Sequence, residues 1–148
     1  MSKKIIITGG LGYIGSELCK LYSGYSWHHK VIVVDNRFIS ERVNQIRNWN
    51  IGYFHGDILD KDFVKKHFKD ADIIHHLAGI TDVPRTKSQS DLEKDRLIKI
   101  VAEKGTQNIL DIINDKCKII FPSTHVVYEG INKVKTDIKE EELSLIHI

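Results

Sequence analysis

The chain is poor in the residues that mark several protein classes. Its 148 residues include two cysteines, two prolines and one methionine. The 22 basic and 20 acidic residues leave a formal net charge of +2, too small to indicate a nucleic acid as partner. No apolar run approaches the roughly 18 residues that a membrane-spanning helix needs. These features exclude collagenous, disordered and transmembrane classes and predict one globular domain over residues 1–148.

The expected compartment follows from the cysteines and the start of the chain. The apolar residues 5–7 are followed at once by Thr8-Gly9-Gly10, which is too early for a signal peptide. Cys19 and Cys117 lie far apart and form no metal or redox spacing. Unpaired thiols without an export signal favour the reducing cytoplasm.

Short apolar runs alternate with longer amphipathic stretches along the chain. Several runs are rich in Ile and Val without polar alternation, which is typical of strands buried on both faces of a parallel sheet. The expected strands are Lys4 to Thr8, Lys30 to Val34, Ile51 to Phe54, Asp72 to Leu77 and Lys118 to Phe121. The expected helices are Tyr13 to Tyr22, Ser40 to Trp49 with Ser40 as N-cap, Asp60 to Phe68, and Leu92 to Asn114 interrupted by Gly105. This alternation predicts an α/β fold with a doubly wound parallel sheet, the Rossmann fold. The tail from Lys135 to Ile148 is not assigned to any element.

A glycine-rich turn after the first expected strand is the most specific local pattern. Gly10, Gly12 and Gly15 match the dinucleotide-binding spacing, and Gly9, Gly12 and Gly15 match a variant of it. Glycines allow a tight turn, a close approach of the backbone to a diphosphate, and close packing of helix on sheet. Free N–H groups at the helix start then face the phosphates. Glycines also occur at tight turns for purely steric reasons, so the pattern needs support from the surrounding sequence.

An acidic residue supplies that support. Asp35 ends the second expected strand 20 residues after Gly15, which is the spacing of the acid that binds the adenosine ribose. A carboxylate there accepts hydrogen bonds from the ribose diol and repels a 2′-phosphate, which favours NAD over NADP. Arg37, two residues later, weakens that exclusion.

Further segments follow in a characteristic order. They are Thr8 to Gly15, Asp35-Asn36, Gly56-Asp57-Ile58, His76-Leu77-Ala78-Gly79 and Gly105 to Leu110. Over roughly residues 3 to 130 the chain thereby resembles the extended short-chain dehydrogenase/reductases, which include UDP-glucose 4-epimerases and other sugar-nucleotide epimerases and dehydratases. The resemblance implies NAD as cofactor and a nucleotide sugar as substrate. It implies cofactor contacts at Gly9, Gly10, Gly12, Tyr13, Ile14, Gly15, Asp35, Asn36, Asp57, Ile58, Leu77, Ala78 and Gly79.

One more segment of the resemblance concerns catalysis. Residues 121–128 are similar to the family's fifth strand, which implies that Thr124 is the catalytic hydroxyl at the sugar oxygen. Ser123 and His125 are then candidate substrate contacts. A hydroxyl that merely closes a strand end is the alternative for Thr124, and packing is the alternative for His125.

The family's Tyr-x-x-x-Lys pair is missing, since none of the five tyrosines has Lys four residues later. The resemblance therefore implies an NAD-binding portion, truncated before the last strands and the substrate domain and inactive alone. It also implies a possible homodimer. A non-catalytic dinucleotide-binding regulator and an interaction module without ligand are the alternatives. No metal site is expected, because the neighbouring His75 and His76 should point to opposite faces of a strand.

Overall fold

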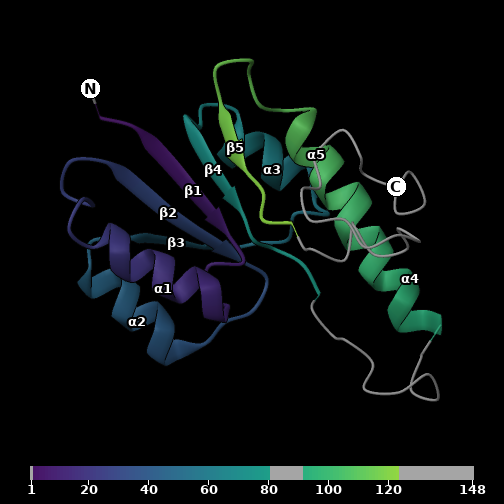
Figure 1. The fold of residues 1–148 in the computed structure, drawn as a ribbon, viewed down its shortest axis with the longest axis horizontal. Helices are drawn as coiled ribbons and strands as arrows, with labels where there is room; N and C mark the ends of the chain where they lie inside the picture. The colour runs from purple at the N-terminus through teal and green to yellow at the C-terminus, as the bar shows by residue number, and fades with distance from the viewer. Residues whose placement is uncertain (1, 81–91, 124–148) are drawn as a thin grey trace, which may run out of the picture.

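A parallel sheet organises the molecule. The structure, a computed structural model, describes residues 2–80 and 92–123. Within these residues, five strands pair in the order β3-β2-β1-β4-β5, all parallel (Figure 1). The strands are β1 (Lys4–Thr8), β2 (Lys30–Asp35), β3 (Gly52–His55), β4 (Ile73–His76) and β5 (Lys118–Ile120). The chain first builds outward from β1 through β2 to β3 and then crosses to the other side of β1.

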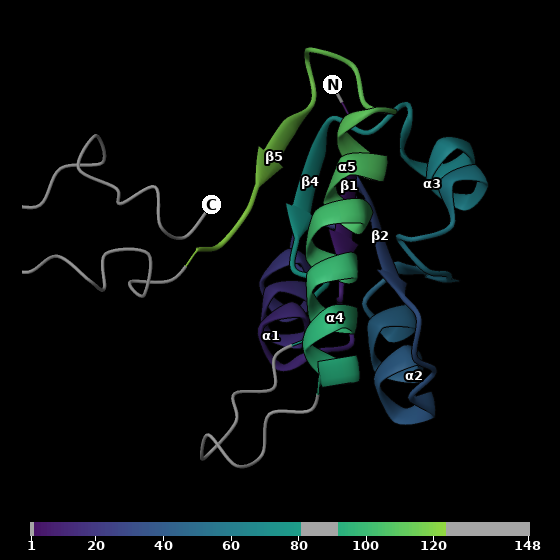
Figure 2. The same ribbon diagram turned by 90° about the vertical axis from the view of Figure 1, so that its right-hand side faces the viewer.

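The connections between strands are helical. The helices are α1 (Tyr13–Tyr22), α2 (Ser40–Asn48), α3 (Lys61–Phe68), α4 (Leu92–Ile100) and α5 (Thr106–Leu110). A π-helical turn, Val101–Gly105, joins α4 to α5, and Figure 2 shows the two as one continuous rod. In the part of the chain that the structure describes, no helix is long and apolar enough to cross a membrane.

Alternate side chains of the strands point to opposite faces of the sheet and pack into two separate cores. One core packs under α1 and α2 and contains Ile5, Ile7, Leu11, Cys19, Val31, Val33, Val43, Ile46 and Ile51. The other packs under α3 and α5 and contains Ile6, Ile32, Val34, Ile58, Val64, Phe68, Ala71, Ile74 and Ile109. Because both faces of the sheet are covered, the central strands carry almost continuous apolar runs. The predicted doubly wound fold is confirmed.

Two local expectations were wrong. Ser40 is the first residue of α2, and Ile39 occupies the N-cap position. Gly105 does not interrupt the long helix, because the chain passes through it in the π-helical turn. A Cβ on Gly105 would lie 2.5 Å from Cδ1 of Ile58, so glycine allows this helix to lie close to the loop after β3. The segments 81–91 and 124–148 lie outside the described residues.

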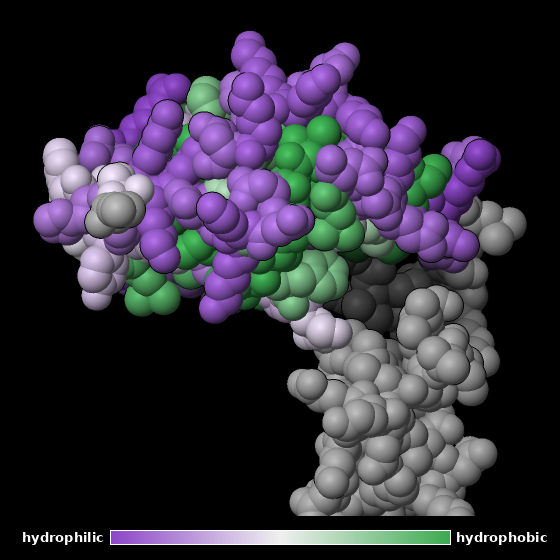
Figure 3. All heavy atoms as spheres, turned by 90° about the horizontal axis from the view of Figure 1, so that it is seen from above, coloured by the Kyte–Doolittle hydropathy of each residue, from purple (hydrophilic) through white to green (hydrophobic). Residues whose placement is uncertain are grey.

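Charged side chains gather where the strands begin. The Lys4 ammonium pairs with Asp70, and the Lys4 backbone N–H donates to Asp72 Oδ2 at 2.7 Å. The face seen from above in Figure 3 is mostly hydrophilic, with hydrophobic atoms showing between the polar ones. The candidate site lies at the other end of the strands.

Candidate functional site

The predicted cofactor segments come together at the carboxyl ends of the strands. The glycine turn follows β1, Asp35 ends β2, residues 56–58 follow β3, and residues 77–79 follow β4. The direction of winding reverses between β1 and β4, and open α/β sheets bind ligands at such a switch point. Segments up to 70 residues apart in the sequence thus lie together at the carboxyl edge of the sheet.

The glycine turn is packed against the neighbouring strand ends. Gly9 has a φ of +65°, in the left-handed region, and a Cβ there would lie 2.8 Å from Leu77 O and 2.9 Å from Ala78 N. A Cβ on Gly15 would lie 2.6 Å from both Gly10 Cα and Gly9 O. The Gly12 N–H closes the turn by donating to Gly9 O at 2.9 Å. The turn therefore excludes side chains at Gly9 and Gly15 for steric reasons.

Gly12 is less crowded than these glycines. Its φ of −73° and ψ of 177° suit any residue, and the atoms nearest to a Cβ there are Gly9 O at 3.1 Å and an Arg37 Nη at 3.9 Å. Gly12 is the N-cap of α1 and makes no side-chain cap hydrogen bond. Tyr13 and Ile14, which begin the helix, are 83% and 63% exposed. This helix start presents uncapped N–H groups to an anion without a side chain in the way.

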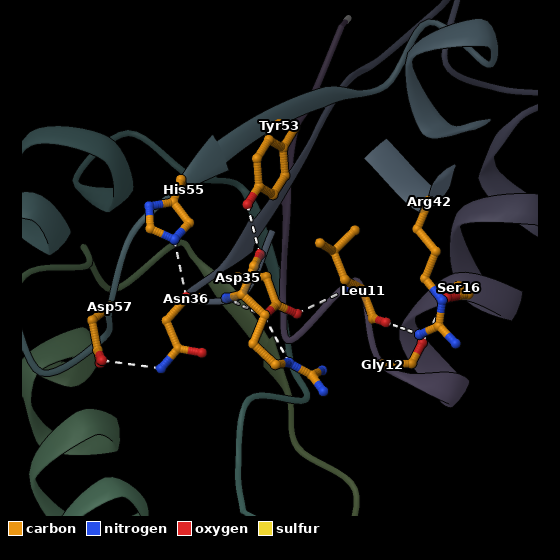
Figure 4. A network of polar contacts seen from close by, with 10 residues as sticks. Leu11, Gly12, Ser16, Asp35, Asn36, Arg42, Tyr53, His55 and Asp57 are labelled. Carbon is orange, nitrogen blue, oxygen red and sulfur yellow. Dashed lines mark hydrogen bonds and ion pairs between the residues drawn. The ribbon is translucent and has the colours of Figure 1, made fainter. Parts of the chain in front are cut away.

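Asp35 links the glycine turn to the end of β2. Its side chain is 3% exposed, and Oδ2 accepts from the Leu11 backbone N–H at 3.0 Å (Figure 4). Oδ1 accepts from the Arg37 backbone N–H at 3.0 Å and lies 3.4 Å from Arg37 Nε. A carboxylate offers about four acceptor positions, so these contacts leave roughly one for a ligand. Its binding to ribose remains a prediction.

The loop after β3 is tied to the loop after β2. The Asn36 amide donates to Asp57 Oδ2 at 3.1 Å (Figure 4). Asp57 Oδ1 accepts from the Leu59 N–H at 2.9 Å. Ile58 is buried against Gly105, and the Asn108 amide donates to Ile58 O at 2.9 Å. The predicted adenine-side residues therefore sit in a fixed frame beside Asp35.

Thr8 and His76 hold the loop after β4. Both lie in segments of the predicted resemblance, but neither was predicted as a contact residue. Thr8 Oγ1 accepts from the N–H groups of Leu77 and Ala78, at 3.1 and 3.0 Å. The Thr8 hydroxyl proton is then available to donate to His76 Nδ1, which lies 2.8 Å away. Because Nδ1 accepts, His76 is a neutral imidazole whose proton is on Nε2, and Nε2 donates to Thr106 Oγ1 at 2.9 Å. Burial lowers the pKa of His76 and so favours this neutral form.

The one sign of this network in the sequence is Thr8, which stands directly before Gly9 and Gly10. The neighbouring His75 points to the other face, where Tyr22 Oη lies 2.7 Å from its Nε2. The predicted alternation of the two histidines is confirmed. In residues 2–80 and 92–123, no three His, Cys, Asp or Glu side chains are grouped to hold a metal ion.

The proposed catalytic segment is described only in part. Ser123 is exposed and follows β5, on the same edge as the glycine turn. Thr124 and His125 lie outside the described residues, so their assignments remain predictions.

A doubly wound sheet with this glycine turn and buried acid at the switch point defines a Rossmann-type α/β protein. Comparison with known proteins then gives the family. The chain belongs to the 3-beta hydroxysteroid dehydrogenase/isomerase family, whose model matches residues 6–146.

Individual relatives act on nucleotide sugars. A UDP-N-acetyl-alpha-D-glucosaminuronate decarboxylase from Bacillus cytotoxicus is 33% identical over 132 residues, which are 86% of this chain and 38% of that protein. A dTDP-D-glucose 4,6-dehydratase from Dictyostelium discoideum is 32% identical over 136 residues, 85% of this chain and 30% of that protein. These relatives confirm the predicted resemblance to extended short-chain dehydrogenase/reductases. The chain spans less than half the length of either relative.

A solved structure supports the fold. The UDP-glucose 4-epimerase from Bifidobacterium longum, in complex with NAD⁺ and UDP, superimposes with a TM-score of 0.72 at 22% identity. The match covers 93% of this chain and 41% of that one.

Proposed function

We propose that this chain forms the NAD-binding part of an enzyme that acts on a nucleotide sugar by transient hydride transfer at a ring carbon. The observation that carries the proposal is the open helix start at Gly12, placed beside Asp35 at the switch point of the sheet. Membership of a dehydrogenase family and relatives acting on nucleotide sugars support the same reading.

The residues at this edge suit the parts of NAD. The diphosphate would lie against the N–H groups of the first turn of α1, where Gly12 has no Cβ to obstruct it. The adenosine ribose would take the remaining acceptor position of Asp35, and Asn36 with Asp57 and Ile58 would flank the adenine. Leu77, Ala78 and Gly79 would form the floor on the other side. NAD supplies the redox chemistry when bound, while the protein orients it and excludes competing reactions.

The substrate side of the proposal rests on the hydroxyl predicted at Thr124, which would donate a hydrogen bond to the sugar oxygen at the reacting carbon. Removing that oxygen's proton needs a base, and a tyrosine serves only with a cation that lowers its pKa. No tyrosine in these 148 residues has Lys four residues later. We therefore expect NAD binding without turnover from these residues alone. Steady-state epimerisation of a UDP-sugar by them would refute this expectation.

The test of NAD binding is a substitution that blocks the diphosphate with little change to the fold. Gly12→Ala suits this purpose, because the backbone angles accept alanine and the one tight contact of the new Cβ, 3.1 Å to Gly9 O, is milder than those at Gly9 and Gly15. Isothermal titration with NAD should show binding to the wild-type chain. Gly12→Ala should weaken it about tenfold or more, the loss expected when a charge-assisted hydrogen bond is displaced.

Gly24→Ala is the matched control, since its Cβ meets nothing within 4 Å and Gly24 is exposed. Gly24→Ala should melt within about 2 °C of wild type. Gly12→Ala should lose about 1 kcal/mol or less, because alanine is a poorer N-cap than glycine and Gly9 O must move by a few tenths of an ångström, so its folded state is verified by circular dichroism before the titration. Folded wild-type protein that binds no NAD, or a Gly12→Ala variant that binds it as tightly as wild type, would contradict the proposal.

A further inference from the structure

A chain of hydrogen bonds through His76 runs beneath the loop that follows β4. At one end of it, the N–H groups of Leu77 and Ala78 donate to Thr8 Oγ1. At the other end, His76 Nε2 donates to Thr106 Oγ1 on α5. Thr8 is fully buried and His76 is 2% exposed, so water does not replace the contact between them. The chain ties β1 and α5 to the loop at residues 77–79, which is predicted to contact the cofactor.

The Thr8 hydroxyl has no room for another donor. A hydroxyl oxygen has two lone pairs and one proton. The N–H groups of Leu77 and Ala78 occupy the lone pairs, and the proton points to His76 Nδ1 at 2.8 Å. A second proton on the His76 ring would sit on Nδ1 and face a donor in place of an acceptor. Thr8 can accept from that proton only if it releases one of the two loop N–H groups.

The same loop packs directly against the glycine turn. A Cβ on Gly9 would lie 2.8 Å from Leu77 O and 2.9 Å from Ala78 N, and the Gly9 N–H is itself held by Val34 O at 2.8 Å. A loop released from Thr8 therefore has to move away from the turn. This movement alters the surface that the loop offers to a nucleotide lying beside the turn.

We propose that His76 is a positioning residue that makes NAD binding depend on pH, because the loop at residues 77–79 keeps its binding conformation only while the His76 ring is neutral. This inference rests on the proposed function, since it concerns the same nucleotide.

The surroundings of the ring carry no competing charge. The His76 ring meets Thr8 from β1, Thr106 from α5, and the ring of Phe121 after β5, whose centroid lies 5.3 Å away. None of these three side chains titrates. Burial lowers the pKa of His76 from its ordinary 6.5, and among the described residues no charged side chain contributes to that shift. The pH response therefore reports the ring itself.

Isothermal titration of the 148-residue chain with NAD between about pH 8 and pH 5 tests the inference, with circular dichroism at each pH to verify the fold. Since NAD then binds only the neutral form, its affinity should be constant down to about pH 7 and fall about threefold or more by about pH 5. By linkage, binding at the lower pH should release up to about one proton per nucleotide. Titrations in two buffers with different ionisation enthalpies measure that release.

His76→Asn separates the titration of the ring from its packing. The asparagine Oδ1 takes the place of Nδ1 and can accept from Thr8, but it has no proton to gain in this range. The variant should bind NAD within about threefold of wild type at about pH 8 and keep that affinity at about pH 5. His55→Gln is the matched control, because it removes another imidazole of this edge, whose Nε2 lies 3.0 Å from Asn36 O (Figure 4). It should keep the wild-type pH dependence.

Wild-type protein that binds NAD equally well across this pH range would overturn the inference and leave the proposed function standing. Binding without proton release at the lower pH would also overturn it, and so would a His76→Asn variant with the wild-type pH dependence. Loss of the pH dependence in His55→Gln would assign the effect to His55 instead. Folded protein that binds no NAD even at about pH 8 would overturn both proposals.

Discussion

The packing of α1 against the glycine turn depends on the missing side chain of Gly15. An alanine Cβ at this position would lie 2.6 Å from Gly10 Cα and from Gly9 O, and 2.8 Å from Gly10 C. All three are backbone atoms of the turn, so no flexible side chain can move aside. Gly15→Ala should therefore push the start of α1 away from the turn.

Two opposing effects set the size of the change. Forcing an extra methyl group into a packed site costs about 1–3 kcal/mol. Gly15 is the third residue of α1. Replacing a glycine inside a helix by alanine stabilises the helix by about 1 kcal/mol, which offsets part of this cost. The expected net loss is about 0–2 kcal/mol, which for a chain of this size lowers the melting temperature by up to roughly 8 °C.

Thermal unfolding followed by circular dichroism measures this loss, with Gly24→Ala as the control that adds the same methyl group in open space. The control should be neutral or stabilised by up to about 1 kcal/mol. In a titration with NAD, Gly15→Ala should also bind more weakly, since the displaced amides no longer face the diphosphate. If Gly15→Ala matches the control in both stability and affinity, the account of the turn is wrong.

Three further predictions concern the frame around the site. Asp60→Ala removes the cap that accepts from two N–H groups of α3 at 3.0 Å each, so urea unfolding should show a loss of about 1 kcal/mol, while Asp60→Asn should retain most of it. Asn108→Ala leaves two backbone carbonyls unpaired and should cost about 1–3 kcal/mol by the same assay, whereas the exposed neighbour Gln107→Ala should cost little. Burial lowers the pKa of His76 in the folded chain. As the pH falls below about 6.5, His76 is therefore protonated more readily in the unfolded chain than in the folded one, and the folded state loses stability. The melting temperature should fall between about pH 7 and pH 5, and His76→Gln should show a shallower fall; an unchanged slope would contradict the assigned neutral histidine.

The strands and most helices could be predicted from the sequence because burial on both faces of a parallel sheet leaves unbroken apolar runs. The run from Lys4 to Thr8 and the helix from Tyr13 to Tyr22 have the predicted bounds. The glycine turn was recognisable in part because the steric limit at Gly15 acts between atoms of the motif itself, Gly9 and Gly10, whereas the limit at Gly9 comes from the distant Leu77 and Ala78.

Contacts between distant segments were not predictable. Nothing near Asp35 in the sequence indicates that its carboxylate accepts from the Leu11 backbone, because the donor is a main-chain group 24 residues earlier. The role of Gly105 likewise depends on Ile58, which the fold brings against it. Helix propensity alone predicts a break where a glycine stands inside a helical pattern. Only the packing shows that the helix continues.

A crystal structure of the chain with NAD bound tests the central claim most directly. The account predicts the diphosphate about 3 Å from the backbone N–H groups at the start of α1, and a ribose hydroxyl at hydrogen-bonding distance from Asp35. Crystals grown at saturating NAD in which the nucleotide lies elsewhere, or in which side chains fill the space beside Gly12, would contradict it.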